Sequence, residues 1–342
     1  MFLQMAEKNP PKYGFATAGD FPTWKRLAKE AVLSCLGETP PAVSPNPELV
    51  VEWLDRGIRK QKYLIDVGPD ISAVLQVNHP TLEKDSARKI PAIFCWHGHG
   101  SFGKEPVMGN SGTPQIEEQI QTMNYDYGHQ MAEAGYITYA IDWIGCGDQN
   151  DALKPHFLST AGGRDWCNLY YLHATMLGTT PLAINLAHGR AATDFVLTLP
   201  EVDSRNLGVM GLSGGGTMTL WTALTDDRFR AAEIICYSDL WALFGIRDIN
   251  YCGMQVAPGL FRLVDLPDLQ GLLAPLPLLI DIGANDKCFA SQNAMRCFCK
   301  LRDIYRSARA EDHLHLDLFA GGHAWGGNKS RDFFGTYLRK GD

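Results

Sequence analysis

One stretch of this chain constrains its fold more than any other: an apolar run that ends in a Gly-x-Ser-x-Gly pattern. Residues 207–212 are apolar or glycine, Ser213 follows, and residues 217–224 have the spacing of a buried helix. A serine that attacks a carbonyl stands on a sharp turn between a strand and a helix, because only there do its hydroxyl and the next backbone N–H face the same atom. The stretch therefore predicts such a turn at Ser213, where Gly211 and Gly215 relieve the crowding.

The same five letters would also fit a glycine-rich turn at the end of a strand. The chain has 34 glycines in 342 residues, so the pattern alone is modest evidence. Its context is more informative, because the pattern follows a strand-like run and precedes a helix-like one, as a nucleophilic serine requires. We therefore favour a nucleophile at Ser213.

Strand-like and helix-like segments alternate along most of the chain. Continuous apolar runs predict strands at 90–96, 136–142, 207–212, 231–237, 277–282 and 315–319. Helical spacing predicts helices at 127–134, 182–199, 290–307 and 329–338. Before them, turn residues 68–70 separate two runs that predict a hairpin, so the sheet begins antiparallel. The alternation predicts an α/β fold: a mostly parallel central sheet with helices on both faces, and a ligand site at the carboxyl ends of the strands.

The chain is expected to form one large domain with an N-terminal addition. Residues 1–56 contain several prolines and one segment at helical spacing, 24–33, and predict a helical extension packed on the core. The catalytic domain would then span 57–342. Two connections within it, 143–180 and 238–274, are too long for ordinary surface loops, so we expect them to lie near the site as cap-like excursions.

The composition argues against several kinds of partner. The net charge is -7 and no lysine or arginine cluster occurs, which argues against nucleic acid. Residues 1–8 lack the basic and apolar regions of an export signal, and no run of about 18 apolar residues could cross a membrane. We therefore expect a cytoplasmic protein with a small-molecule partner and no membrane partner, and the composition leaves a homo-oligomer open.

The nine cysteines are an odd number and form no Cys-x-x-Cys pair, which favours reduced, buried thiols. Cys297 and Cys299 could be a redox or metal pair. Two ligands without nearby partners are more often part of a helix, and we interpret them so. No cofactor is expected from these patterns.

Two further polar residues complete a chemical argument for Ser213. A serine hydroxyl is a poor nucleophile, so it needs a base to take its proton and a carboxylate to hold that base in the right tautomer. Asp286 follows Ser213 by 286 − 213 = 73 residues, and His323 follows Asp286 by 323 − 286 = 37. Each comes directly after a predicted strand, so the three are expected to meet at one edge of the sheet as a catalytic triad.

Other residues compete for the acid and base roles. Asp239 follows the preceding strand and is the alternative acid, whereas Asp281 lies inside a strand. We prefer Asp286, because a loop two strands after the serine lets a carboxylate reach the imidazole. His313 and His315 fall before or within the last strand and are expected to be packed.

The oxyanion of the tetrahedral intermediate needs two backbone donors. One is expected at Gly214, directly after the nucleophile, and the other in the loop 97–100, at His99 or Gly100. A zinc site at His97-x-His99 is disfavoured, because no third ligand lies at a sensible spacing and glycines flank both histidines. We therefore expect no metal.

These motifs together resemble the α/β-hydrolase superfamily, and within it the bacterial branch of acetyl xylan esterases and dienelactone hydrolase-like proteins. The resemblance covers residues 21–338. The residues that carry it are His-Gly-His-Gly at 97–100, Ala-Ile-Asp-Trp-Ile-Gly-Cys-Gly-Asp at 140–148, Leu-Pro-Glu-Val-Asp at 199–203, Gly-Leu-Ser-Gly-Gly at 211–215, Ala-Pro-Leu-Pro-Leu-Leu at 274–279 with Gly283 and Asp286, and Gly-Gly-His at 321–323.

The resemblance implies a carboxylic ester hydrolase that works through an acyl-enzyme. Relatives often carry a proline and apolar residues after the acid, whereas Lys-Cys-Phe-Ala stands at 287–290 here. The absence of an export signal directs the expectation toward small soluble esters. Trp143 and Trp241, in the two excursions, would suit an apolar acyl or aryl group as substrate-binding residues, although packing would explain them equally well.

Two other functions remain open. The same triad could hydrolyse a lactone, an amide or a carbon–carbon bond, because these reactions share the nucleophile and the oxyanion hole. A non-catalytic binding module would be indicated by the loss of a triad residue, and none is lost. A peptidase would normally need a large additional domain, which this length excludes.

Overall fold

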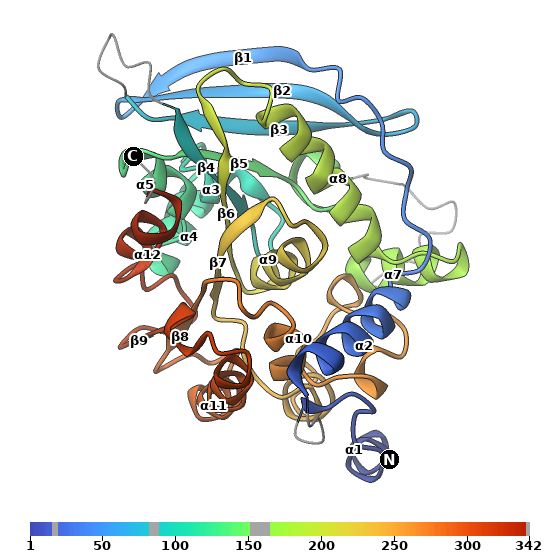
Figure 1. The fold of residues 1–342 in the computed structure, drawn as a ribbon. Helices are drawn as coiled ribbons and strands as arrows, with labels where there is room; N and C mark the ends of the chain where they lie inside the picture. The colour runs from blue at the N-terminus through green and yellow to red at the C-terminus, as the bar shows by residue number, and fades with distance from the viewer. Residues whose placement is uncertain (16–19, 82–88, 151–164, 340–342) are drawn as a thin grey trace.

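A computed structural model describes residues 1–15, 20–81, 89–150 and 165–339. These residues form one central nine-stranded sheet in the order β1-β2-β3-β5-β4-β6-β7-β8-β9, with helices packed against it (Figure 1). The strands are β1 (Glu48–Asp55), β2 (Ile58–Gly68), β3 (Ile71–His79), β4 (Ile90–Trp96), β5 (Ile137–Ile141), β6 (Val202–Leu212), β7 (Phe229–Ile235), β8 (Leu278–Gly283) and β9 (Leu314–Phe319).

The sheet begins antiparallel, as the turn residues predicted. β1, β2 and β3 form two consecutive hairpins, and β3 lies antiparallel to β5. Arg56 and Gly57 connect β1 to β2 with positive φ angles of 49° and 81°, which is the backbone of a tight two-residue hairpin turn. The boundary that the sequence suggested at residue 56 therefore falls inside a hairpin, and residues 48–55 are part of the sheet rather than of a helical extension.

The other strands are parallel. β5, β4, β6, β7, β8 and β9 pair in that spatial order, each parallel to its neighbour. All seven residues of β4 are buried, because helices cover both faces of the sheet at this point. This two-sided burial explains why the strand has a continuous apolar sequence instead of an alternating one.

Helices cover both faces of the sheet, as the alternation predicted. They are α1 (Phe2–Lys8), α2 (Phe21–Ser34), α3 (Lys104–Val107), α4 (Pro114–Met123), α5 (Tyr127–Glu133), α7 (Trp166–Met176), α8 (Pro181–Val196), α9 (Gly214–Thr225), α10 (Leu266–Gly271), α11 (Ser291–Ser307) and α12 (Ser330–Leu338). One apolar cluster joins α2, α8, α9, α10 and α11 to Phe94 and Trp96 of β4. A second cluster joins α3, α5 and α12 to Ile93 and Cys95 on the opposite face. The fold is that of an α/β protein with a three-layer core (Figure 1).

Local capping sets where the helices begin. α8 begins at Pro181, because the Thr180 hydroxyl accepts a hydrogen bond from the Ala183 N–H at 3.2 Å and proline needs no N–H at the first helical position. The helix ends at Val196, three residues before the end that the sequence pattern suggested. The sequence thus predicted the helix correctly and its last turn incorrectly.

The two long connections contain short helices of their own. The first includes α7, and its residues 151–164 lie outside the described part of the chain. The second includes α10 and the short helical turns Ala242–Arg247, Gly253–Gln255 and Leu260–Arg262; two further turns are Gly147–Gln149 and Glu311–His313. α7 packs against the turn Gly253–Gln255, so the two excursions contact each other. Within the ranges described above, no helix combines the length and the apolar character needed to cross a membrane.

Candidate active site

Ser213 lies on the sharp turn between β6 and α9 that the sequence predicted. It is the residue before the first turn of α9, with φ 60° and ψ -119°, and its N–H donates to the Ile235 carbonyl at 2.8 Å. A non-glycine residue with positive φ is strained, and such strain is common where function requires a particular side-chain direction. A Cβ at Gly211 would lie 2.5 Å from the Gly215 backbone, and one at Gly215 would overlap the carbonyl oxygen of the neighbouring strand β4. Both glycines are therefore needed by the turn.

Asp286 and His323 form a hydrogen-bonded pair. His323 Nδ1 and Asp286 Oδ2 are 2.9 Å apart. The other oxygen, Oδ1, accepts from the Cys288 N–H at 2.6 Å and the Phe289 N–H at 3.0 Å. Burial raises the pKa of Asp286, but the His323 imidazole and these two N–H groups outweigh it and hold the pKa below its ordinary value. The carboxylate is therefore fixed in its charged form beside the imidazole.

The loops that carry Asp286 and His323 contact each other through their backbones. The Asn285 N–H donates to the Gly321 carbonyl at 2.9 Å. A Cβ at Gly283 would overlap the Gly322 carbonyl, so glycine is required where these loops meet. The Phe289 ring stacks on the imidazole of His323 with centroids 5.7 Å apart.

Cys236, at the end of β7, connects this pair to the serine. Its thiol donates to the Ala324 carbonyl at 3.4 Å, next to His323, while the preceding residue Ile235 accepts the Ser213 N–H. Ser213 and His323 therefore flank the same two residues at the carboxyl end of β7. The sequence-predicted serine, acid and base are brought to one edge of the sheet.

The competing residues lie elsewhere. Asp239 is buried, accepts from the Leu240 N–H at 2.6 Å, and has its pKa raised to about 6 by burial. Asp281 lies within β8, and burial raises its pKa well above its ordinary range. His313 hydrogen bonds to the Pro275 carbonyl at 2.7 Å, and His315 lies 2.8 Å from the Tyr337 hydroxyl. These two histidines are half-buried and hydrogen-bonded away from Asp286.

The loop after β4 contacts the serine directly. A Cβ at Gly98 would lie 2.7 Å from the Leu212 carbonyl and 3.4 Å from Ser213 Cβ, so a side chain cannot be accommodated there. The Gly98 N–H donates to the Tyr125 hydroxyl at 2.5 Å. Within the described ranges, the N–H groups of His99 and Gly100 have no hydrogen-bond acceptor.

His97 holds this loop from the core side. It is fully buried; its Nε2 accepts from the Trp143 N–H at 3.0 Å, and its Nδ1 lies 2.7 Å from the Gly98 carbonyl. The two contacts assign one neutral tautomer, with the proton on Nδ1. Burial lowers the pKa of His97 and favours this neutral form.

A buried ion pair supports the same region. Lys104 Nζ lies 2.7 Å from Asp142 Oδ2 and 2.6 Å from Asp148 Oδ2, and the side chain of Lys104 has no exposed surface. Asp142 also accepts from the backbone N–H groups of Lys104 and Asp148. The pair joins the start of α3 to the end of β5, the two segments on either side of His97.

Comparisons with known proteins agree with this geometry. Residues 1–181, more than half of the 342-residue chain, match the model of the Abhydrolase family. The chain belongs to the Abhydrolase family. Residues 190–333, which include all three triad candidates, match the model of the prolyl oligopeptidase family.

One sequence relative and two solved structures are similar to this Abhydrolase family member. A Bacillus subtilis (strain 168) protein named "Putative hydrolase YtaP" is 23% identical over 235 residues, 68% of this chain and 73% of that protein. A Bacteroides fragilis protein described as a "putative acetyl xylan esterase" superposes with a TM-score of 0.73 over 93% of this chain and 81% of its own, at 19% identity. A glucuronoyl esterase from Solibacter usitatus gives a TM-score of 0.67 over 92% and 93% of the two chains, at 14% identity. The α/β-hydrolase fold expected from the motifs is confirmed.

The two tryptophans expected to bind substrate are both buried in this family member, and their role in substrate binding stays a prediction. Trp143 has no exposed surface, and a Cβ at Gly214 would overlap its ring, so the indole fills the space beside Gly214. Trp241 is 5% exposed and packs against the Tyr251 and Phe261 rings. It borders a pocket of about 270 Å³, but its own surface is almost entirely covered.

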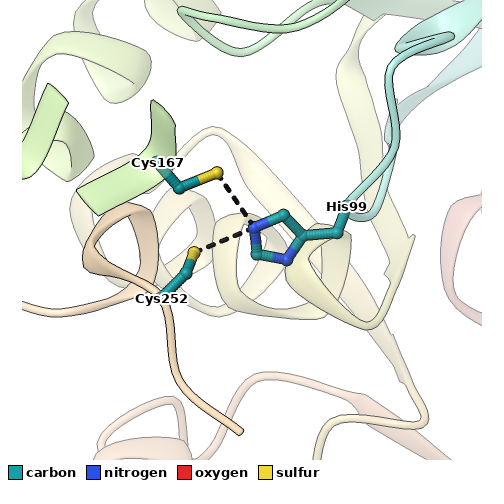
Figure 2. A group of neighbouring side chains, drawn as sticks. All are labelled: His99, Cys167 and Cys252. Carbon is teal, nitrogen blue, oxygen red and sulfur yellow. Dashed lines mark hydrogen bonds between the residues drawn. The ribbon is translucent and has the colours of Figure 1, made fainter. Parts of the chain in front are cut away.

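The side chain of His99 lies between two cysteines. Its Nε2 lies 3.3 Å from Cys167 Sγ and 2.9 Å from Cys252 Sγ (Figure 2). The sequence argument found no third ligand near the two histidines, because it considered only local spacing. The fold brings in two cysteines that are 68 and 153 residues away along the chain.

Proposed function

We propose that this protein is a serine hydrolase that cleaves a carboxylic ester of a small soluble substrate through an acyl-enzyme. The observation that carries the proposal is the Asp286–His323 hydrogen bond at the sheet edge where the strained Ser213 lies. The esterase names of the solved structures with this fold support an ester as the substrate class.

In the first step Ser213 Oγ attacks the ester carbonyl carbon while His323 Nε2 takes the hydroxyl proton. Asp286 keeps the other imidazole proton on Nδ1, so that Nε2 is free to act as the base, and stabilises the imidazolium that forms. Collapse of the tetrahedral intermediate breaks the bond to the alcohol oxygen, which receives the proton from Nε2. The products of this step are the free alcohol and an ester on Ser213.

In the second step a water molecule takes the place of the alcohol. His323 removes a proton from the water as its oxygen attacks the acyl carbon, and then returns the proton to Ser213 Oγ when the acyl–enzyme bond breaks. The carboxylic acid leaves and the free serine is restored.

The oxyanion in both steps would be stabilised by backbone donors. Gly214, at the first position of α9, supplies one N–H, and the loop 97–100 supplies the second, from His99 or Gly100. Two observations support this assignment. In the described part of the chain these three N–H groups have no hydrogen-bond acceptor, and Gly98 packs directly against Ser213.

The proposal is tested by hydrolysis of p-nitrophenyl esters of increasing acyl length with the wild type, Ser213→Ala and the control Ser307→Ala. Ser307 is an exposed serine whose hydroxyl bonds to the Asp303 carbonyl of its own helix. We expect kcat to fall by roughly 10⁴-fold or more in Ser213→Ala, because removal of a triad nucleophile abolishes covalent catalysis. The control should keep the wild-type rate.

A covalent readout makes the test independent of the chosen ester. We expect a burst of one p-nitrophenol per protein molecule with a slowly deacylating ester, and a matching mass increase on the peptide that contains Ser213. A wild type inactive on every ester, or a Ser213→Ala variant that keeps its rate, would overturn the proposal and favour another bond or a binding role.

A further inference from the structure

The cluster of His99, Cys167 and Cys252 is not used by the proposed reaction. The candidate ligand atoms, one imidazole nitrogen and two sulfurs, all lie within 4.8 Å of one another. They come from three separate segments: the loop after β4, the first turn of α7, and the residue before the turn Gly253–Gln255 (Figure 2). The side chains of both cysteines point toward the same ring nitrogen of His99.

The three groups are hydrogen-bonded neighbours, and the two thiols also interact with each other. An imidazole nitrogen carries either one proton or one lone pair, directed outward in the ring plane. Two thiols that approach the same Nε2, at 3.3 and 2.9 Å, cannot both bond along that single direction. One cation placed between the three atoms would satisfy all of them at once.

The distances are close to those of a zinc site. With Zn–S bonds of about 2.3 Å and a Zn–N bond of about 2.0 Å, tetrahedral angles place sulfur and nitrogen about 3.5 Å apart. The present separations of 3.3 and 2.9 Å are shorter than this value by about 0.2 and 0.6 Å, so the ligands would have to move apart by that much when a metal binds. Thiolate and imidazole ligands select zinc over magnesium or calcium, which prefer oxygen.

The segments that supply the cysteines are already docked. The Gly253 N–H donates to the Asn168 side-chain oxygen at 2.9 Å. A Cβ at Gly253 would overlap the Tyr171 side chain, so the backbone of this turn lies directly on α7. The two sulfur ligands are therefore held in place by the fold before any metal binds.

We propose that His99, Cys167 and Cys252 form a binding site for one divalent cation, with Zn²⁺ as the best fit. The protein supplies three ligands and leaves the fourth position to water or a small external ligand. His99 is exposed, so the site is open to solvent. A bound ion would fasten both excursions to the loop 97–100.

The experiment is a Co²⁺ titration of the reduced, chelator-treated full chain. Cobalt replaces zinc in thiolate sites and gives sulfur-to-cobalt charge-transfer absorption, which reports coordination by cysteine directly. We expect saturation at one Co²⁺ per chain and displacement of the cobalt by Zn²⁺. We also expect Zn²⁺ to raise the thermal unfolding temperature, since it binds the folded chain.

Matched cysteine variants locate the site. Cys167→Ser and Cys252→Ser should each lose the charge-transfer band and weaken metal binding at least tenfold. Cys288→Ser and Cys299→Ser, which alter exposed cysteines elsewhere, should bind as the wild type does. Circular dichroism of each variant verifies that loss of binding does not come from unfolding.

Three results would overturn the metal site. The first is the absence of stoichiometric Co²⁺ binding, and the second is undiminished binding in Cys167→Ser. The third is a Cys167–Cys252 disulfide in the purified protein, if the protein still binds no metal after this disulfide is reduced. The titration is also run on Ser213→Ala. Metal binding is measured by absorbance and does not depend on ester hydrolysis. The test of the metal site can therefore fail or succeed independently of the ester hydrolase proposal.

Discussion

Substitution of Asp286 by Asn tests the role of the acid with little change in shape. An Asn oxygen can still accept the Cys288 and Phe289 N–H groups at the position of Oδ1. The amide nitrogen, however, replaces Oδ2 and is a donor, so it can bond to His323 Nδ1 only when that nitrogen carries no proton. The imidazole proton is then placed on Nε2, and the nitrogen that should accept the Ser213 proton is blocked.

The magnitude follows from this change of tautomer. Loss of the correct tautomer in a Ser-His-Asp triad lowers kcat by roughly 10⁴-fold. At 1.36 kcal/mol for each factor of ten, the activation free energy rises by about 5.4 kcal/mol. Because the backbone contacts of Oδ1 are kept, we expect the unfolding temperature to change little.

The assay is kcat on p-nitrophenyl acetate, with thermal unfolding measured in parallel. Asp239→Asn is the matched control, because Asp239 is also a buried aspartate that accepts a backbone N–H, but its contacts are Leu240 and Asn293 rather than His323. We expect this control to stay within a few fold of the wild type. If Asp286→Asn kept its rate while Asp239→Asn lost its activity, Asp239 would be the acid and the present reasoning would be refuted.

Three further predictions concern stability. Gly215→Ala should lower the unfolding free energy by about 1–3 kcal/mol and reduce turnover, because the added Cβ has no room. The control Gly112→Ala should be near neutral, because a Cβ there meets no atom within 4 Å. Equal effects in the two variants would contradict this reasoning. Lys104→Met should lower the free energy of unfolding, measured by chemical denaturation, by about 3 kcal/mol or more, because it leaves buried Asp142 without its cation. An unchanged denaturation midpoint would show that the ion pair does not contribute to stability. Burial raises the pKa of Glu233 from 4.5 to about 7, so the folded protein binds the extra proton in that window and its stability falls as the pH rises through it. Glu233→Gln should flatten this fall in unfolding temperature between pH 5 and 8, and a parallel pH profile would exclude Glu233 as its source.

Much of the fold was predictable from sequence because the parallel strands are buried on both faces. β4 and β8 have no exposed residue, so their continuous apolar runs stand out. β1 was missed as part of the sheet, because it is an edge strand on which Leu49, Val50 and Leu54 are 50%, 60% and 74% exposed. An edge strand of this kind has no burial alternation that a sequence pattern could reveal.

The candidate site was predictable where a candidate residue directly follows a strand. Ser213, Asp286 and His323 each have that local signal, so their common location follows from the topology of a parallel sheet. The expected cytoplasmic location and a homo-oligomer stay predictions of the sequence. The contact of His99 with two distant cysteines had no local signal, since its parts come from three segments that meet only after folding.

The loop 97–100 is where these separate constraints combine. His97 is fixed from the core by the Trp143 N–H, and Gly98 is pressed against Leu212 and Ser213. His99 contacts the two cysteines through its Nε2. Backbone donors that need no rearrangement when charge develops on a substrate stabilise an oxyanion best, so contacts that hold this loop favour such a role. Loss of the cysteine contacts should therefore loosen the same backbone that we expect to supply one of the two oxyanion donors. This connects the proposed metal site to the proposed reaction without giving the metal a chemical step.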